Sequence, residues 1–220
     1  MHGYKEKMRH AKSPKFIIEE VTPYIRRGVR MSLGHTMATY DEAMAEIRAG
    51  ANHATHVFNA MRSYNHREPG VLGAVLTEPS VMCETICDMI HLAPATVKLV
   101  YSAKGLDGMI LISYSVRITG LPNGEYEVNG SIRIVKDGVS RTRTGTIAGS
   151  CFTMDDGARR LIELGFSLEN IARIGALNPA RAVGLDNEIG TIEVGKRADI
   201  IICDDKMNVE RVILRGKELA

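Results

Sequence analysis

The sequence lacks the signs of several protein classes. No Cys-x-x-Cys pair occurs among its four cysteines, which argues against a structural zinc site. No apolar run approaches the roughly 20 residues that span a bilayer, and the polar, basic start has no apolar segment of the signal-peptide kind. The net charge of +2 indicates neither a nucleic-acid nor a membrane surface. We therefore expect a cytoplasmic protein with reduced cysteines, of which Cys83 and Cys87 are buried in the apolar run VMCETIC.

What is present is ordinary globular composition, with 45% hydrophobic and 25% charged residues among 220. Apolar segments at 28–36, 51–59, 81–88 and 108–113 read as strands, and helices are expected at 39–50 and 94–105. Thr39 and Glu42 have the spacing of a capping box at the start of the first helix. Strands that alternate with helices predict an α/β fold with a parallel sheet.

The second half of the chain has a different pattern. Residues 121–146 are polar and alternating, which predicts hairpins with turns at Asn-Gly 123–124, Asn-Gly 129–130 and Asp-Gly 137–138. Helices are expected at 153–165 and 167–185, the latter capped by Ser167. Short strands follow in 190–219, with turns at Gly195, Asp204-Asp205 and Gly216.

Histidines and other polar side chains follow the predicted strands, where a parallel sheet binds its ligands. His35 follows the first strand, His56 ends the second, Asp88 and His91 follow the third, and Tyr114 follows the fourth. We expect His35 and His56 to contact a metal or a substrate. On a strand, His53 and His56 point to opposite faces, so His53 is expected to be structural.

Two loops are candidates for anion binding. Asn59, Arg67 and the backbone around Ala60 could hold a phosphate or carboxylate, because arginine presents a bidentate fork to such groups. The alternative is a solvated loop in which Arg67 pairs with Glu68, and the residues leave both readings open. The segment 145–150 could present backbone amides to a ligand, although it matches no Walker or dinucleotide signature.

Several longer stretches closely resemble the N-acetylglucosamine-6-phosphate deacetylases of the amidohydrolase superfamily. They are SLGHT…HATHVFNAMRSYNHREPGVLGA, ICDMIHLAP, GTIAGSCFTMDDGARRLIE and LNPARAVGLDNEIGTIEVGKRADIIICD, and the resemblance runs from about Pro14 to the C-terminus. The last stretch is shared widely among amidohydrolases, whereas GHT, HATHVFNAM and HREPG are more specific.

The resemblance implies a (β/α)₈ barrel with a small β-sandwich domain, which removes the acetyl group from an amino-sugar phosphate. It implies a divalent metal, zinc or iron, held by a glutamate and two histidines, which His35 and His56 match. It also implies substrate contacts at matching positions, namely Asn59, Ala60, Arg67, His91, Ile147, Ala148 and Gly149. In the family the arginine that Arg67 matches reaches a phosphate across a dimer interface, which implies a homodimer.

The chain departs from the family pattern in two respects. Its four barrel strands match the fifth to the eighth, so we expect a tail at 1–13, the C-terminal half of a barrel at 14–184 and β-sandwich strands at 185–220. The HLEGP-type motif with the glutamate ligand does not occur. Tyr114 stands where the family has its catalytic aspartate, and a tyrosine, with an ordinary pKa near 10, is a poor base at neutral pH.

From these departures we expect little or no deacetylase activity from this chain alone. Two alternatives remain open: a non-catalytic sugar-phosphate binding module, and a half-barrel that a partner chain completes. An amidohydrolase that acts on a cyclic amide fits HVFNAM and HREPG poorly.

Overall fold

The computed structural model describes residues 22–219, so the tail expected at 1–13 lies outside the described residues. The chain divides into two compact units. Among the described residues, one contains 22–85 with 98–110, and the other contains 86–97 with 111–219. Each is described by itself below.

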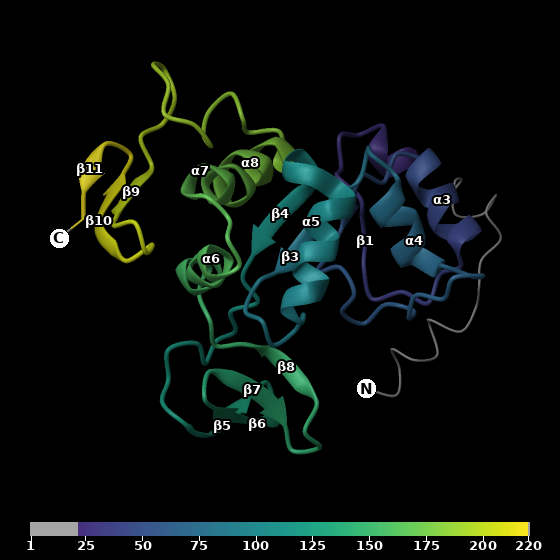
Figure 1. Ribbon diagram of the computed structural model, residues 1–220, viewed down its shortest axis with the longest axis horizontal. Helices are drawn as coiled ribbons and strands as arrows, with labels where there is room; N and C mark the ends of the chain where they lie inside the picture. The colour runs from purple at the N-terminus through teal and green to yellow at the C-terminus, as the bar shows by residue number, and fades with distance from the viewer. Residues whose placement is uncertain (1–21, 220) are drawn as a thin grey trace. The chain divides into compact units, whose positions relative to one another are not determined.

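A sheet with strand order β1-β2-β3-β4 lies mainly in the first unit, and helices connect its strands (Figure 1); β3, α5 and β4 each have residues in both units. The pairs β1–β2 and β2–β3 are parallel, with Ser32 opposite His53 and His53 opposite Met82. In chain order the elements are β1 (Ser32–Leu33), α3 (Tyr40–Arg48), β2 (His53–Ala54), α4 (Gly70–Thr77), β3 (Met82–Ile86), α5 (Pro94–Gly108) and β4 (Met109–Ile112). The predicted parallel sheet of an α/β fold is therefore present.

Two helices of this unit show why the sequence folds locally as it does. The predicted capping box of α3 is present, because the Thr39 side chain accepts from the Glu42 amide and the Glu42 carboxylate accepts from the Thr39 amide. In α4 every residue except Thr77 is buried, as expected for a helix that is apolar all round. A side chain at Gly73 would place its Cβ only 2.3 Å from Pro69, so only glycine fits there.

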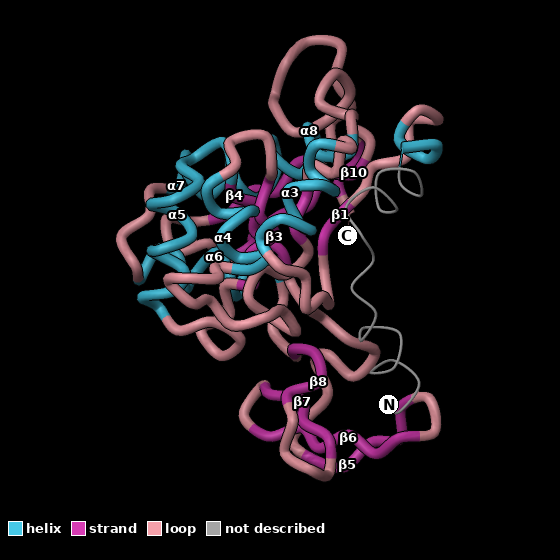
Figure 2. The backbone as a smooth tube through the Cα atoms, turned by 90° about the vertical axis from the view of Figure 1, so that its right-hand side faces the viewer, coloured by secondary structure: helices cyan, strands magenta, loops and turns pink. Residues whose placement is uncertain are grey.

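The second unit contains two antiparallel sheets and a set of helices (Figures 1 and 2). One sheet has the order β5-β6-β7-β8 and the other the order β11-β10-β9. The elements are β5 (Gly124–Val128), β6 (Ser131–Lys136), β7 (Val139–Thr142), β8 (Ile147–Ser150), α6 (Met154–Glu163), α7 (Leu168–Ala172), the π-helix η1 (Arg173–Leu177), α8 (Asn178–Val183), β9 (Ile200–Cys203), β10 (Val209–Leu214) and β11 (Lys217–Glu218).

The hairpin turns of this unit confirm two of the three predicted Asn-Gly and Asp-Gly signals. Asn129-Gly130 and Asp137-Gly138 all have positive φ, and they connect β5 to β6 and β6 to β7. The turn predicted at Asn123-Gly124 is wrong, since Gly124 begins β5. Asn123 instead uses its side-chain oxygen to accept from the Asp137 amide.

The helix predicted over 167–185 is interrupted. Ser167 caps α7 as expected, but η1 separates α7 from α8, and the Asn178 amide bonds the Arg173 carbonyl five residues back. Pro179 explains the irregularity, because it has no N–H to donate to the carbonyl of Gly175.

Among residues 22–219, no helix is long and apolar enough to cross a membrane.

Candidate functional site

Two histidines meet where adjacent parallel strands of the first unit end. His35 follows β1 and His56 follows β2, and their ring centroids are 4.7 Å apart in an edge-on arrangement. His35 is exposed, whereas His56 is only 5% exposed. The two imidazoles that the sequence singles out are therefore brought into contact.

The backbone at these strand ends is strained. His35, His56, Phe58 and Ala60 all have left-handed φ values, of 46°, 36°, 75° and 52°. Residues other than glycine pay about 1–2 kcal/mol each for this conformation, and such strain concentrates at functional sites. The strained residues therefore include His35 and His56, which follow the ends of the paired strands β1 and β2.

The donor set partly fits a metal ion. Imidazoles suit zinc and iron, and the two rings lie side by side with centroids 4.7 Å apart. Catalytic zinc sites usually have three protein ligands. Within residues 22–219 no group of three or more His, Cys, Asp or Glu side chains is placed to hold a metal, so these residues alone do not complete such a site.

The loop after His56 separates the two readings of Arg67. The Glu68 carboxylate accepts from the backbone amides of Tyr40 and Gly70, at 2.9 and 3.2 Å, and so anchors the starts of α3 and α4. Within residues 22–219 no ion pair joins Arg67 to Glu68, so that detail of the solvated-loop alternative is absent, although residues 63–68 are exposed as it expects. Arg67 is exposed, and its backbone amide bonds the Asn65 side chain.

Asn59 braces the same loop. Its side-chain amide nitrogen donates to the backbone carbonyls of His56 and Val57, at 3.2 and 3.3 Å. A contact of Asn59 or Ala60 with a substrate stays a prediction.

The strand predicted over 51–59 is shorter than expected. β2 covers only His53–Ala54, and His56 lies in the left-handed turn beyond it, so the opposite-face argument for His53 rests on a wrong premise. His53 is nevertheless buried, with Nδ1 2.6 Å from the Asn52 side-chain oxygen. Burial lowers the pKa of His53, and the positive charge of Arg30 lowers it further.

Glu84 of β3 is a residue that the sequence reading missed. Its backbone carbonyl accepts from the Val57 amide at 2.8 Å. Burial raises the pKa of its carboxyl, and a hydrogen bond from the His56 backbone acts in the opposite direction. Glu84 therefore holds the turn that carries His56.

In the second unit, Asp88 and His91 form a buried pair just after β3. The Asp88 Oδ2 atom lies 2.7 Å from His91 Nδ1, and the two side chains are 4% and 5% exposed. Asp88 Oδ1 accepts from the backbone amides of Ile90 and His91, both at 2.9 Å. Burial alone would raise the pKa of Asp88, but the hydrogen bonds from His91 and Ile90 outweigh it and lower the pKa to about 2.

Tyr114 packs against this pair. Its ring lies edge-on to the His91 ring, with centroids 5.4 Å apart. The Tyr114 carbonyl accepts from the Ser150 amide at 2.8 Å, which ties it to the end of β8. Tyr114, His91 and the strand that carries Ile147–Gly149 are thus joined within one unit.

β8 is a strand rather than the ligand-binding loop considered for 145–150. The Ala148 carbonyl accepts from the Ser140 hydroxyl. Gly149 has φ +86°, and a Cβ there would lie 2.1 Å from the Val116 side chain, so glycine is required. Substrate contact by Ile147, Ala148 and Gly149 stays a prediction.

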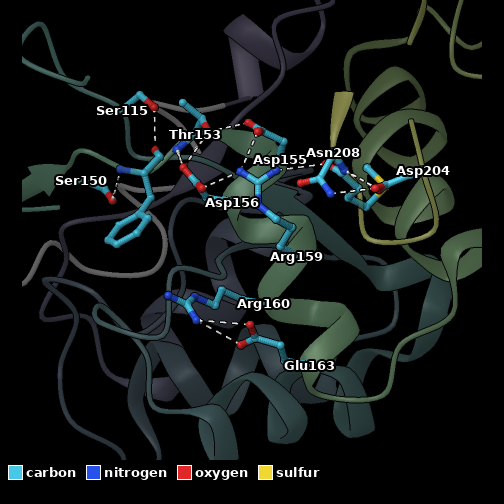
Figure 3. A network of polar contacts seen from close by, with 12 residues as sticks. Ser115, Ser150, Thr153, Asp155, Asp156, Arg159, Arg160, Glu163, Asp204 and Asn208 are labelled. Atoms are coloured by element: carbon cyan, nitrogen blue, oxygen red, sulfur yellow. Dashed lines mark hydrogen bonds and ion pairs between the residues drawn. The ribbon is translucent and has the colours of Figure 1, made fainter. Parts of the chain in front are cut away.

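A polar network continues from the Tyr114 segment onto α6 (Figure 3). Ser115 donates to the Phe152 carbonyl, and the Phe152 amide donates to Ser150. Thr153 and Asp156 then cap α6, and Arg159 bridges Asp155 and Asp156 while donating to the Met207 carbonyl. The network holds the segment after β4 against the start of a helix.

Known proteins resemble this chain over most of its length. The family model described as the amidohydrolase family matches residues 15–219. An N-acetylglucosamine-6-phosphate deacetylase of Bacillus subtilis is 39% identical over 186 residues, which are 84% of this chain and 47% of that protein. An N-acetylgalactosamine-6-phosphate deacetylase of Escherichia coli O157:H7 is 33% identical over 193 residues, covering 87% of this chain and 51% of that one.

Solved structures give the same result. The N-acetylglucosamine-6-phosphate deacetylase of Pasteurella multocida superposes with a TM-score of 0.87 at 31% identity, over 92% of this chain and 54% of its own. A mutant of the Mycobacterium smegmatis enzyme in complex with N-acetyl-D-glucosamine-6-phosphate gives 0.86 at 35% identity, over 91% and 54%. The chain spans about half the length of the relatives it matches.

Proposed function

Because this chain belongs to the amidohydrolase family, we propose that its site recognises an N-acetylated amino-sugar 6-phosphate, as in the deacetylases to which it is similar. The observation that carries the proposal is the contact between His35 and His56 at the ends of adjacent parallel strands. In an α/β fold such strand ends are where ligands bind.

The phosphate has a candidate partner in Arg67. This side chain is exposed and forms no ion pair with the neighbouring Glu68. A guanidinium in this state can bind a phosphate through two parallel hydrogen bonds. The preceding loop, braced by Asn59, offers the backbone around Ala60 to the same group.

Deacetylases of the amidohydrolase family typically depend on a divalent metal ion. His35 and His56 would be two of its ligands in this chain, and zinc or iron suits imidazole donors. Since the described residues offer no third protein ligand, they do not supply a complete hydrolytic centre by themselves.

Tyr114 is the reason to separate binding from turnover. Hydrolysis of an amide needs a group that takes a proton from water and returns it to the leaving nitrogen. A phenol is a weak base at neutral pH and does not serve this purpose as a carboxylate does. We therefore infer that this chain binds the sugar phosphate and releases little or no acetate from it.

The test is a pair of assays on the same purified chain. Calorimetric titration with N-acetylglucosamine 6-phosphate should give saturable binding, and the galactosamine epimer shows which sugar is preferred. Acetate release is then measured with zinc or iron supplied. Release at an ordinary enzymatic rate would refute the inference about turnover, and no heat with either sugar phosphate would refute recognition.

Replacing Tyr114 by aspartate makes the acetate-release assay more specific. We expect Tyr114→Asp alone to leave acetate release near background, because a third metal ligand is still lacking among residues 22–219. Tyr114→Phe is the matched control, since it keeps the ring that packs on His91. Rapid acetate release by the aspartate variant would contradict this expectation.

A further inference from the structure

We propose that Asp88 is a positioning residue: it holds the His91 imidazole with its proton on Nδ1, so that the buried Nε2 accepts a hydrogen bond from a bound ligand. The ligand class is one with a hydroxyl or amide N–H to donate. The inference rests on the proposed function for the identity of that ligand, an amino sugar, but the tautomer can be tested without it.

The tautomer follows from the partner of Nδ1. Asp88 Oδ2 lies 2.7 Å from that nitrogen. An ionised carboxylate only accepts hydrogen bonds, and the pKa of Asp88, about 2, keeps the group ionised at neutral pH. The proton between the two atoms therefore belongs to His91 Nδ1, which leaves Nε2 of the neutral ring as an acceptor.

Asp88 is itself held in place. Its other oxygen accepts from the amides of Ile90 and His91, so the carboxylate cannot rotate without losing two hydrogen bonds. The chain must bend sharply to allow this, and Met89 has a left-handed φ of 60°. A backbone that accepts strain of this kind to orient one carboxylate is typical of a functional position.

The His91 ring is also in contact with Tyr114, which packs edge-on with ring centroids 5.4 Å apart. The imidazole side chain is 5% exposed, and Nε2 has no hydrogen-bond partner in the described part of the chain. A buried acceptor without a partner costs about 1–3 kcal/mol. A purely structural pair would gain nothing from this cost, whereas a ligand that donates to Nε2 would remove it.

The experiment is a two-bond ¹H–¹⁵N correlation spectrum of the chain with ¹⁵N-labelled histidine, recorded at pH 8. The resonances of His91 are identified as those that are missing from the spectrum of His91→Gln. In the unaltered protein Nδ1 should carry the proton and Nε2 should not. In Asp88→Asn the proton should move to Nε2, because the carboxamide can donate to Nδ1.

Asp156→Asn is the matched control, since Asp156 also accepts hydrogen bonds from a backbone amide but caps α6. It should leave the His91 spectrum unchanged. A His91 that carries its proton on Nε2 in the unaltered protein would overturn the proposal, even if Asp88→Asn does not fold. The same tautomer in folded Asp88→Asn would overturn it too.

The ligand arm uses N-acetylglucosamine 6-phosphate. Saturating sugar should shift the ¹⁵N resonance of His91 Nε2, and Asp88→Asn should bind about tenfold more weakly, equivalent to about 1.4 kcal/mol. Binding without any change at Nε2 would overturn the acceptor role. Absence of binding to the unaltered protein would refute the proposed function instead. The positioning role of Asp88 would still be tested by the His91 tautomer in the unaltered protein and in Asp88→Asn.

Discussion

Replacing Met89 by glycine should stabilise the protein relative to replacing it by alanine. Both variants remove the same half-buried side chain, so the comparison isolates the backbone. Met89 has φ +60°, inside the turn that the Asp88 carboxylate closes. A residue with a Cβ pays about 1–2 kcal/mol for this conformation, and glycine does not.

Glycine has a cost of its own, since it loses more conformational freedom on folding, by about 0.5–1 kcal/mol relative to alanine. The difference leaves Met89→Gly more stable than Met89→Ala by about 0.5–1 kcal/mol. With a urea m-value of about 2 kcal/mol per M, the unfolding midpoint should rise by about 0.3–0.5 M.

The matched control is Ala95→Gly, at an exposed position of α5 where φ is not positive. There the same exchange of alanine for glycine should lower the free energy of unfolding by about 0.5–1 kcal/mol. If Met89→Gly is less stable than Met89→Ala by a similar amount, the turn at Met89 is not strained. Backbone strain would then no longer support the positioning role of Asp88.

Three further changes test other parts of the structure. Lys104→Met should lower the free energy of unfolding by about 1–3 kcal/mol, because Lys104 donates to the carbonyls of Val75 and Glu78 at the end of α4. Lys98 is exposed on the same helix, α5, so Lys98→Met should change this free energy little. Chemical denaturation measures both variants, and equal effects would contradict the contacts of Lys104. The lowered pKa of Asp88 stabilises the fold at pH values above its unfolded pKa near 3.9, and this contribution, about 2.5 kcal/mol at most, should be lost as the pH falls towards 2. The stability gap between the unaltered protein and Asp88→Asn should therefore narrow between about pH 5 and pH 2, and a gap that stays constant with pH would refute the shift. Arg67→Ala should weaken binding of N-acetylglucosamine 6-phosphate about tenfold without changing binding of the unphosphorylated sugar. Arg48→Ala is the control and should change the binding of neither sugar. Calorimetry measures these affinities, and equal losses for both sugars in Arg67→Ala would exclude a contact between Arg67 and the phosphate.

Local patterns predicted much of the fold. The capping box of Thr39 and Glu42 and the turns at Asn129-Gly130 and Asp137-Gly138 were readable because each depends on a few adjacent residues. Asn123-Gly124 carries the same letters but forms no hairpin turn, since its register is set by the partner strand and by the bond to Asp137.

The site was readable only in part, for a physical reason. The order of strands and helices indicated that His35 and His56 follow neighbouring strands, and the structure brings their rings together. The left-handed turn at His56 could not be read from the sequence, because histidine has no strong preference for it and tertiary contacts impose it.

The sequence identifies Asp88 as a strand-end residue but does not predict its pairing with His91. The available signal was the Asp-x-x-His spacing directly after a buried strand, where a turn can fold the carboxylate back onto the ring. Glu84 offered no such signal, since its burial beside the His56 turn depends on the packing of the sheet.

The most direct test of the central claim is one calorimetric titration of the chain, supplied with zinc, with N-acetylglucosamine 6-phosphate. Binding without turnover predicts heats that decline to saturation and return to baseline after each injection. A sustained heat that continues until the sugar is consumed would show hydrolysis despite Tyr114, and the absence of any heat would show that the site does not recognise this class of ligand.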